Sequence, residues 1–218
     1  MSKTQSEAQL EANLIKRLVG LGYAPVTIRD GAELRANLKS QMEKHNGVVL
    51  SDTEFARLLN HLDKGNVFDR ATTLREPRIL IQRDNGDPLY LNLLNTEHWC
   101  QNQYQVTTQV TMEGKHKTRY DVTLLINGLP LVQIELKRRG MELKEAFNQI
   151  NRYQRHSYWA EDGLFQYVQL FVISNGVNTK YYANNRDQDF KQTFFWAKED
   201  NTLITQLDAF ADAFLEKC

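Results

Sequence analysis

The chain has 218 residues, of which 41% are hydrophobic and 10% aromatic, and this is enough to build one sizeable core. Its formal net charge is zero, which argues against a protein held on nucleic acid by bulk charge. Neither an apolar run of about 18 residues nor an apolar signal segment is present, so we expect a cytoplasmic protein with no membrane contact.

The first half of the chain is predicted to be mostly helical. Apolar residues at helical spacing predict a helix over residues 6–21 and a shorter one over residues 31–45. The sequence Ser-Asp-Thr-Glu that starts at Ser51 is typical of a capping box, so a third helix should begin there. Apolar runs at 78–82 and 89–94 flank Asp-Asn-Gly-Asp, which predicts a β-hairpin.

The second half of the chain alternates strands and helices. The predicted strands are 104–112, 120–126, 131–137, 167–173 and, at an edge, 180–183. Helices are predicted over 142–154 and over 201–217. The order strand, strand, helix, strand indicates a mixed α/β fold.

One predicted hairpin, residues 119–137, carries two acids and a lysine among apolar residues. Side chains alternate along a strand, so Asp121 points away from the apolar row of the first arm, which consists of Tyr120, Val122, Leu124 and Ile126. In the second arm, Glu135 and Lys137 point away from the apolar row in the same manner. If both apolar rows line one core, as in a half-buried sheet, the two carboxylates and the ammonium group emerge together on the other face.

The same alternation of side chains limits the number of residues in the turn of this hairpin. A two-residue Asn-Gly loop would pair Ile126 with Leu129 and put Asp121 opposite Ile134, which mixes the two faces. We therefore predict a loop with an odd number of residues or a β-bulge, with Gly128 in the left-handed conformation.

Two carboxylates a few ångströms apart form a hard-oxygen site that suits Mg²⁺, which keeps several waters and takes few protein ligands. Asp121 and Glu135 would be metal ligands, and the backbone carbonyl of Leu136 would complete the protein's share. A bound Mg²⁺ lowers the pKa of a water and neutralises charge on a phosphoryl transition state. Lys137 would orient or deprotonate that water. The hairpin therefore indicates hydrolysis of a phosphodiester.

The Glu-x-Lys spacing alone is weak, because the chain contains it twice more, at Glu113 and at Glu142. The first lies in an expected loop, and the second lies on an expected helix, where residues two apart do not share a face. An alternative is that Asp121, Glu135 and Lys137 are polar residues on the solvated face of an edge hairpin.

The region around the hairpin is basic although the chain is neutral. Residues 112–156 hold nine Lys or Arg against five Asp or Glu, which gives +4 here and −4 elsewhere. In the following helix Gln149 and Tyr153 share a face, and Arg152 lies on the polar side. These side chains could contact phosphate or position the lysine. Alternatively, Tyr153 is an ordinary core residue and Gln149 its exposed neighbour.

The sequence from Arg119 to Gly140, followed by Glu-Ala-Phe-Asn-Gln-Ile-Asn-Arg-Tyr at 145–153, closely resembles the nuclease domain of the motor (R) subunit of type I restriction enzymes. That domain belongs to the PD-(D/E)xK nuclease superfamily. The likeness continues through residues 170–176 and 200–204. It implies a restriction-endonuclease-like α/β core, with a mixed central β-sheet flanked by helices. Residues 1–218 would form one such domain, elaborated by a hairpin and helices at about 25–100.

The resemblance also implies roles for individual residues. It places the family's metal-binding acids, lysine and glutamine–tyrosine motif on Asp121, Glu135, Lys137, Gln149 and Tyr153. Some superfamily members also use a first-helix glutamate near the metal; Glu11 is the candidate and Glu7 its rival. Tyr120 stands where the motif has a proline, which is the one departure.

The implied function is a metal-dependent endonuclease domain that cleaves duplex DNA after ATP-driven translocation in a bacterium or archaeon. The chain has no Gly-x-x-x-x-Gly-Lys-Ser/Thr loop, so ATP would serve only helicase-like motor domains downstream in a longer protein. The methyltransferase and specificity subunits would be partners. Because the specificity subunit would read the target sequence, this domain would contact backbone phosphates.

Two other functions stay open on the sequence. One is a non-catalytic module that binds DNA or docks a subunit and retains the nuclease fold. The other is a stand-alone, structure-specific nuclease such as a resolvase, which would be active without a motor.

Overall fold

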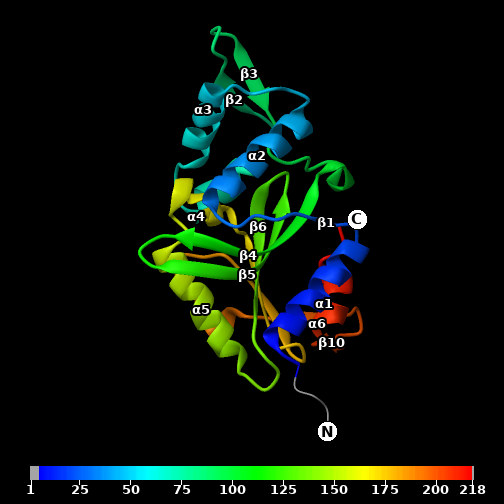
Figure 1. Cartoon of the computed structure of the whole chain (residues 1–218). Helices are drawn as coiled ribbons and strands as arrows, with labels where there is room; N and C mark the ends of the chain where they lie inside the picture. The colour runs from blue at the N-terminus through cyan, green and yellow to red at the C-terminus, as the bar shows by residue number, and fades with distance from the viewer. Residues whose placement is uncertain (1–4, 218) are drawn as a thin grey trace.

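The computed structural model describes residues 5–217 and is centred on a six-stranded mixed β-sheet with helices on both faces (Figure 1). The strands lie in the order β1 (Ala24–Pro25), β4 (Tyr104–Glu113), β5 (Lys117–Ile126), β6 (Leu129–Leu136), β7 (Leu170–Ser174) and β8 (Thr179–Ala183). Neighbouring strands are antiparallel, except that β1 runs parallel to β4 and β6 runs parallel to β7. The α/β architecture expected from the sequence is therefore confirmed.

Four of the α-helices that the structure describes begin close to where the sequence predicts. The α-helices are α1 (Glu7–Gly20), α2 (Gly31–Asn46), α3 (Asp52–Leu62), α4 (Val67–Thr73), α5 (Leu143–His156) and α6 (Leu207–Phe214). The smaller elements are the ribbons β2 (Ile79–Gln82) with β3 (Pro88–Leu91) and β9 (Trp196–Ala197) with β10 (Leu203–Ile204), and the 3₁₀ segments η1 (Trp99–Gln101), η2 (Glu161–Tyr167) and η3 (Phe190–Gln192). Capping boxes at Ser6 and Ser51 start α1 and α3.

Some boundaries differ from the predictions. The final helix predicted over 201–217 is wrong at its start, because Leu203–Ile204 pair with β9 and α6 begins only at Leu207. The strand predicted over 167–173 begins at Leu170, since Tyr167 still belongs to η2. The helix α4 was not predicted because its seven residues are too few to show a clear helical repeat.

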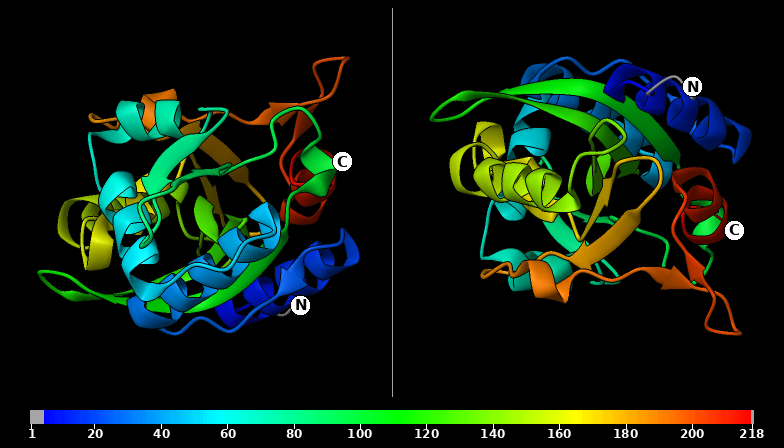
Figure 2. Two further views of the ribbon diagram at one scale, coloured as in Figure 1. Left: turned by 90° about the horizontal axis from the view of Figure 1, so that it is seen from above. Right: turned by 90° about the horizontal axis from the view of Figure 1, so that it is seen from below.

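Apolar clusters cover both faces of the sheet. On one face α1 and α6 lie side by side (Figure 2) and pack on residues such as Val122 and Ile134. On the other face α5 and the segment 28–93 pack on residues such as Leu125. The expectation of a half-buried hairpin is therefore wrong. Gln133 and Glu135, which alternate with Ile134, are fully buried.

In strand β5 the alternation of side chains between the two faces of the sheet is broken at Asp121. Val122 packs with α1 and α6, whereas Tyr120 packs with α5 on the other face. An undisturbed strand would place both side chains on one face, as the sequence analysis expected, so the prediction for Tyr120 is wrong. The break coincides with Gln109 of the neighbouring β4, whose φ of +59° is uncommon for a residue with a side chain. Such irregularities re-aim side chains beside functional sites.

The turn between β5 and β6 contains the predicted bulge. Ile126 pairs with Leu129 across a two-residue loop, and the register shifts because Leu131 is an extra residue between the pairs that flank it. The loop is therefore even, and the bulge restores the parity of the two faces. Gly128 is left-handed, with φ of +83°, as predicted. A Cβ atom at this position would also lie 2.8 Å from Cα of Leu38.

The segment before β4 shares its core with the sheet. Leu38 of α2, Leu58 of α3 and Leu91 of β3 belong to the same buried cluster as Leu125 and Phe165. That residues 25–100 elaborate a single nuclease domain stays a prediction. In the part of the chain that the structure describes, no helix combines the length and the apolar character that a membrane span requires.

Candidate active site

Asp121 and Glu135 are brought together by the register of β5 and β6. Val122 pairs with Ile134 and Thr123 with Gln133, so Asp121 is one step further along, beside Glu135. The backbone N–H of Leu136 donates a hydrogen bond of 2.9 Å to Oδ2 of Asp121. The aspartate is thus held against the strand that carries the glutamate.

Lys137 completes the group. Its Nζ donates to Oε1 of Glu135 and to the carbonyl oxygen of Leu136, both at 3.1 Å. Its backbone N–H donates to the carbonyl of Ser174 at 2.8 Å, which ties the end of β6 to β7. The lysine side chain is 12% exposed, and that of Glu135 is 0% exposed. The ammonium group therefore contacts two of the three protein groups that the sequence analysis assigned to a metal.

The carboxylates are held in an unfavourable environment. Burial raises the pKa of Glu135 well above its ordinary value, and the neighbouring Asp121 raises it further. Burial also raises the pKa of Asp121, although the Leu136 N–H and Lys137 oppose this. Oε2 of Glu135 is buried and has no hydrogen-bond partner among the residues that the structure describes. A cation beside this oxygen would relieve the cost of burying the charge.

The donor set fits a hard divalent cation that needs few protein ligands. Within residues 5–217, no three His, Cys, Asp or Glu side chains gather closely enough to hold a metal by themselves. A zinc site would normally use three or four such side chains. The two carboxylates and the Leu136 carbonyl instead resemble the oxygen sites that retain several waters.

A cavity of about 460 Å³ opens beside Asp121 and is walled by α1. Glu11 lines this cavity and accepts a hydrogen bond from Nε2 of Gln109. Burial raises the pKa of Glu11, and the Asp121 charge contributes to the shift. The rival Glu7 also lines the cavity and accepts from the backbone N–H of Arg138 at 3.1 Å. Both glutamates face the site, and a metal-binding role for either stays a prediction.

The glutamine–tyrosine pair of α5 reaches β5. Gln149 donates to the hydroxyl of Tyr153, which in turn donates to the backbone carbonyl of Arg119 at 3.0 Å. Tyr153 is buried in the core, and its burial raises the pKa of its hydroxyl. The pair therefore fixes α5 to the strand two residues before Asp121. Arg152 is exposed and makes no hydrogen bond or ion pair with another described residue.

Three contributors to the site were not predicted. Arg119 lines the cavity beside Asp121, and the alternation of β5 could have indicated it, because residues two apart share a face. Gln109 holds Glu11 through a backbone conformation that no local pattern announces. Ser174 acts through its backbone carbonyl, so its side-chain identity carries no signal.

Comparison with known proteins identifies the family of the chain. A family model described as "Type I restriction enzyme R protein N terminus" matches residues 4–190. The chain belongs to this family. It is 46% identical to the endonuclease subunit of a type I restriction enzyme of Staphylococcus aureus (strain COL), over 98% of this chain and 23% of that protein. With the type I restriction enzyme EcoprrI endonuclease subunit of Escherichia coli it shares 42% identity, over 98% of this chain and 71% of that protein.

The family reaches beyond bacteria. A putative type I restriction enzyme endonuclease subunit of Methanocaldococcus jannaschii is 34% identical over 56% of this chain and 12% of that protein. The chain spans 23% of the length of its staphylococcal relatives. Membership of the type I restriction endonuclease family, inferred from the motifs around Asp121 and Glu135, is confirmed.

Proposed function

We propose that this chain is the metal-dependent endonuclease domain of a type I restriction enzyme R subunit and hydrolyses phosphodiester bonds of duplex DNA. The observation that carries the proposal is the convergence of Asp121, Glu135 and Lys137 around a buried, unpaired carboxylate oxygen. The family's members are named as endonuclease subunits, which supports the same reaction.

The rest of the reaction cycle belongs to parts outside this chain. In this proposal ATP-driven translocation is the work of motor domains elsewhere in the longer R subunit. Methyltransferase and specificity subunits are its partners in the cytoplasm. The domain itself contacts the phosphate backbone of DNA and needs no base-specific contact, because sequence recognition is separate.

We propose Mg²⁺ as the cofactor, held by the carboxylates of Asp121 and Glu135 and the carbonyl of Leu136, with Glu11 as a further candidate. When bound, this ion supplies Lewis acidity, which lowers the pKa of a water and neutralises phosphate charge. The fit rests on the oxygen donors of the site and on the unpaired Oε2 of Glu135.

The remaining residues position the reaction. The ammonium group of Lys137, 3.1 Å from Glu135, orients the attacking water or stabilises the negative phosphate oxygens. Gln149 and Tyr153 act as positioning residues, because they fix α5 to the carbonyl of Arg119 and so hold the strand of Asp121. Hydrolysis consumes one water and breaks one phosphorus–oxygen bond of the DNA strand.

Metal binding by the 218-residue chain tests this proposal without the motor. Calorimetric titration with Mn²⁺ or Mg²⁺ should give binding that Asp121→Asn and Glu135→Gln weaken by at least about tenfold, because each removes a charged ligand. Asn and Gln preserve size, so the fold survives. Glu113→Gln, an exposed acid at the end of β4, is the matched control and should bind as the wild type does.

Binding that is absent, or that survives both substitutions, would remove the catalytic assignment. A non-catalytic DNA-binding or docking module would then be the better description.

A further inference from the structure

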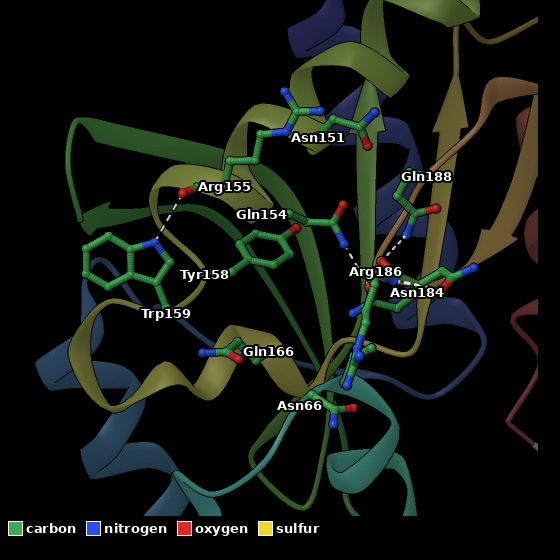
Figure 3. Close-up of a pocket in the computed structure, with 12 residues that line it drawn as sticks. Asn66, Asn151, Gln154, Arg155, Tyr158, Trp159, Gln166, Asn184, Arg186 and Gln188 are labelled. Carbon is green, nitrogen blue, oxygen red and sulfur yellow. Dashed lines mark hydrogen bonds between the residues drawn. The ribbon is translucent and has the colours of Figure 1, made fainter.

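A second polar pocket lies on another face of α5 from the Gln149–Tyr153 pair. It has a volume of about 290 Å³ and is formed where the C-terminal half of α5 meets η2, the start of α4 and residues 184–188 (Figure 3). None of its twelve lining residues belongs to the catalytic set. Its volume lies at the lower end of the range for ligand pockets, which indicates a small ligand or one unit of a larger ligand.

The lining consists of carboxamides and guanidinium groups. The polar side chains are Asn66, Asn151, Gln154, Gln166, Asn184, Asn185, Gln188, Arg155 and Arg186. No Asp or Glu lines this pocket. A carboxamide carries a donor and an acceptor, and a guanidinium carries donors with a positive charge. Asn66 and Asn184 use both groups of their carboxamides within the protein, so the other carboxamides face a ligand. The pocket therefore favours a ligand with an anionic group and a neutral polar edge, and disfavours cations.

Several of these groups have no partner. Oδ1 of Asn151 and the hydroxyl of Tyr158 are buried and make no hydrogen bond in the described part of the chain. Buried polar atoms are normally paired, so two unpaired atoms on residues that line one small pocket are unusual. The side chains of Gln166, Arg155 and Arg186 likewise make no hydrogen bond or ion pair with residues 5–217.

Other groups are held in fixed positions. Nε2 of Gln154 donates to Oδ1 of Asn184 at 2.7 Å, and Nδ2 of Asn184 donates to the carbonyl of Val168 at 2.6 Å. This leaves the carbonyl oxygen of Gln154 as a positioned acceptor. The indole N–H of Trp159 donates to the carbonyl of Arg155 at 3.2 Å, while the ring is 55% exposed at the rim.

The two arginines lie at opposite ends of the pocket (Figure 3). Arg155 extends from α5 beside Asn151, whereas the guanidinium of Arg186 lies over the ring of Phe68 in α4, 5.7 Å from its centre. A ligand with two anionic groups on either side of a polar centre fits this spacing better than a ligand with one anionic group.

We propose that this pocket binds one nucleotide of a DNA single strand. Carboxamides pair with the donor and acceptor edge of a base, and Arg155 and Arg186 contact the phosphates before and after it. Trp159 supplies a flat surface on which a base stacks. An acidic peptide would use the arginines and leave the carboxamides unpaired, so a nucleotide is the better match. The site lies apart from the catalytic residues and needs no metal.

Binding of a short labelled single strand to the 218-residue chain, followed by fluorescence anisotropy in EDTA, tests this inference. The single strand should bind more tightly than a duplex of the same sequence and more tightly than dAMP. Arg155→Gln and Arg186→Gln should each weaken binding by about tenfold, because each removes a charge-assisted contact to phosphate. Gln154→Leu, which keeps the size of the side chain, should weaken binding by a similar factor.

The control is Arg78→Gln, which removes the same charge from an exposed position away from the pocket and should change little. The proposal is overturned if the strand does not bind, or if Arg78→Gln weakens binding as much as Arg186→Gln does. If dAMP binds as tightly as the single strand, the proposal of a DNA strand is overturned and the ligand is a free nucleotide. Because EDTA suppresses metal-dependent chemistry, failure of this experiment leaves the nuclease proposal intact, and loss of the metal site leaves the pocket intact.

Discussion

The catalytic residues lie on β5 and at the end of β6, the nucleotide pocket lies at the C-terminal half of α5, and the two have opposite chemistry. At the catalytic site, buried carboxylates surround an ammonium group, and an oxygen of Glu135 lacks a partner. In the pocket, neutral carboxamides stand between the unpaired guanidinium groups of Arg155 and Arg186. The catalytic site lacks a positive charge beside the buried oxygen of Glu135, and the pocket lacks an anion beside its two guanidinium groups. The comparison teaches that the chemistry a polar site lacks indicates its ligand more directly than its size does.

The two sites also differ in how the protein supports them. Asp121, Glu135 and Lys137 stand on adjacent strands and are held by backbone hydrogen bonds to neighbouring strands. The pocket instead depends on side chains from four separate segments, such as Gln154 and Asn184. We therefore expect substitutions at the catalytic site to change chemistry and charge, and substitutions at the pocket to change recognition.

The largest expected effect concerns DNA cleavage by the full-length R subunit assembled with its partner subunits. Lys137→Ala should lower the cleavage rate by about 10³-fold, because general acid–base and electrostatic contributions of one residue are of this size. ATP hydrolysis should persist, since the motor domains are untouched. Cleavage of plasmid DNA and phosphate release, measured together, separate the two activities.

The matched control for this prediction is Lys144→Ala on α5, which has the same Glu-x-Lys spacing but is exposed. It should cleave at the wild-type rate. If Lys137→Ala cleaved DNA at the wild-type rate, Lys137 would not differ from Lys144 and would have no catalytic role.

The next expected effect is on the stability of the folded chain, and it concerns the buried carboxyl group of Glu135. Because burial raises the pKa of Glu135 above its ordinary value of 4.5, the folded chain holds this proton more tightly than the unfolded chain. In the metal-free wild type the contribution of Glu135 to stability should therefore be fully present below pH 4.5 and be lost as the pH rises through the raised pKa. Relative to Glu135→Gln, we expect the free energy of unfolding of the wild type to fall as the pH rises above this value.

Urea unfolding at a series of pH values measures this difference. Gln154→Leu in the pocket removes no ionisable group, so its stability difference from the wild type should not vary with pH. If Glu135→Gln and the wild type showed the same pH dependence of unfolding, the inference that burial raises the pKa of Glu135 would be wrong.

The smallest expected effect compares two tyrosines near the two sites. The hydroxyl of Tyr153 donates to the Arg119 carbonyl at 3.0 Å, whereas the buried hydroxyl of Tyr158 has no partner in the described chain. Tyr153→Phe should lower the free energy of unfolding by about 1 kcal/mol, because it removes satisfied hydrogen bonds. Tyr158→Phe should be neutral or slightly stabilising, because it removes an unpaired polar atom. Thermal unfolding of both variants checks the pair, and equal losses would contradict the assignment.

Much of the local structure follows from the sequence. The helices α1 and α3 were predicted because apolar spacing and capping residues act within one or two turns. The bulge between β5 and β6 was predicted because side-chain parity is a property of the strands themselves. The start of α6 was missed, since Leu203–Ile204 form a strand only through pairing with β9.

The convergence of Asp121, Glu135 and Lys137 was predicted from the sequence, and the pairing of β5 with β6 brings Asp121 beside Glu135. Only the tertiary structure decided that this face is buried, that Tyr120 turns to the opposite core, and that Gln109 and Arg119 complete the surroundings. The nucleotide pocket was invisible in the sequence. Its residues come from segments far apart in the chain, and no local periodicity links Asn66 to Asn184 before packing brings them together.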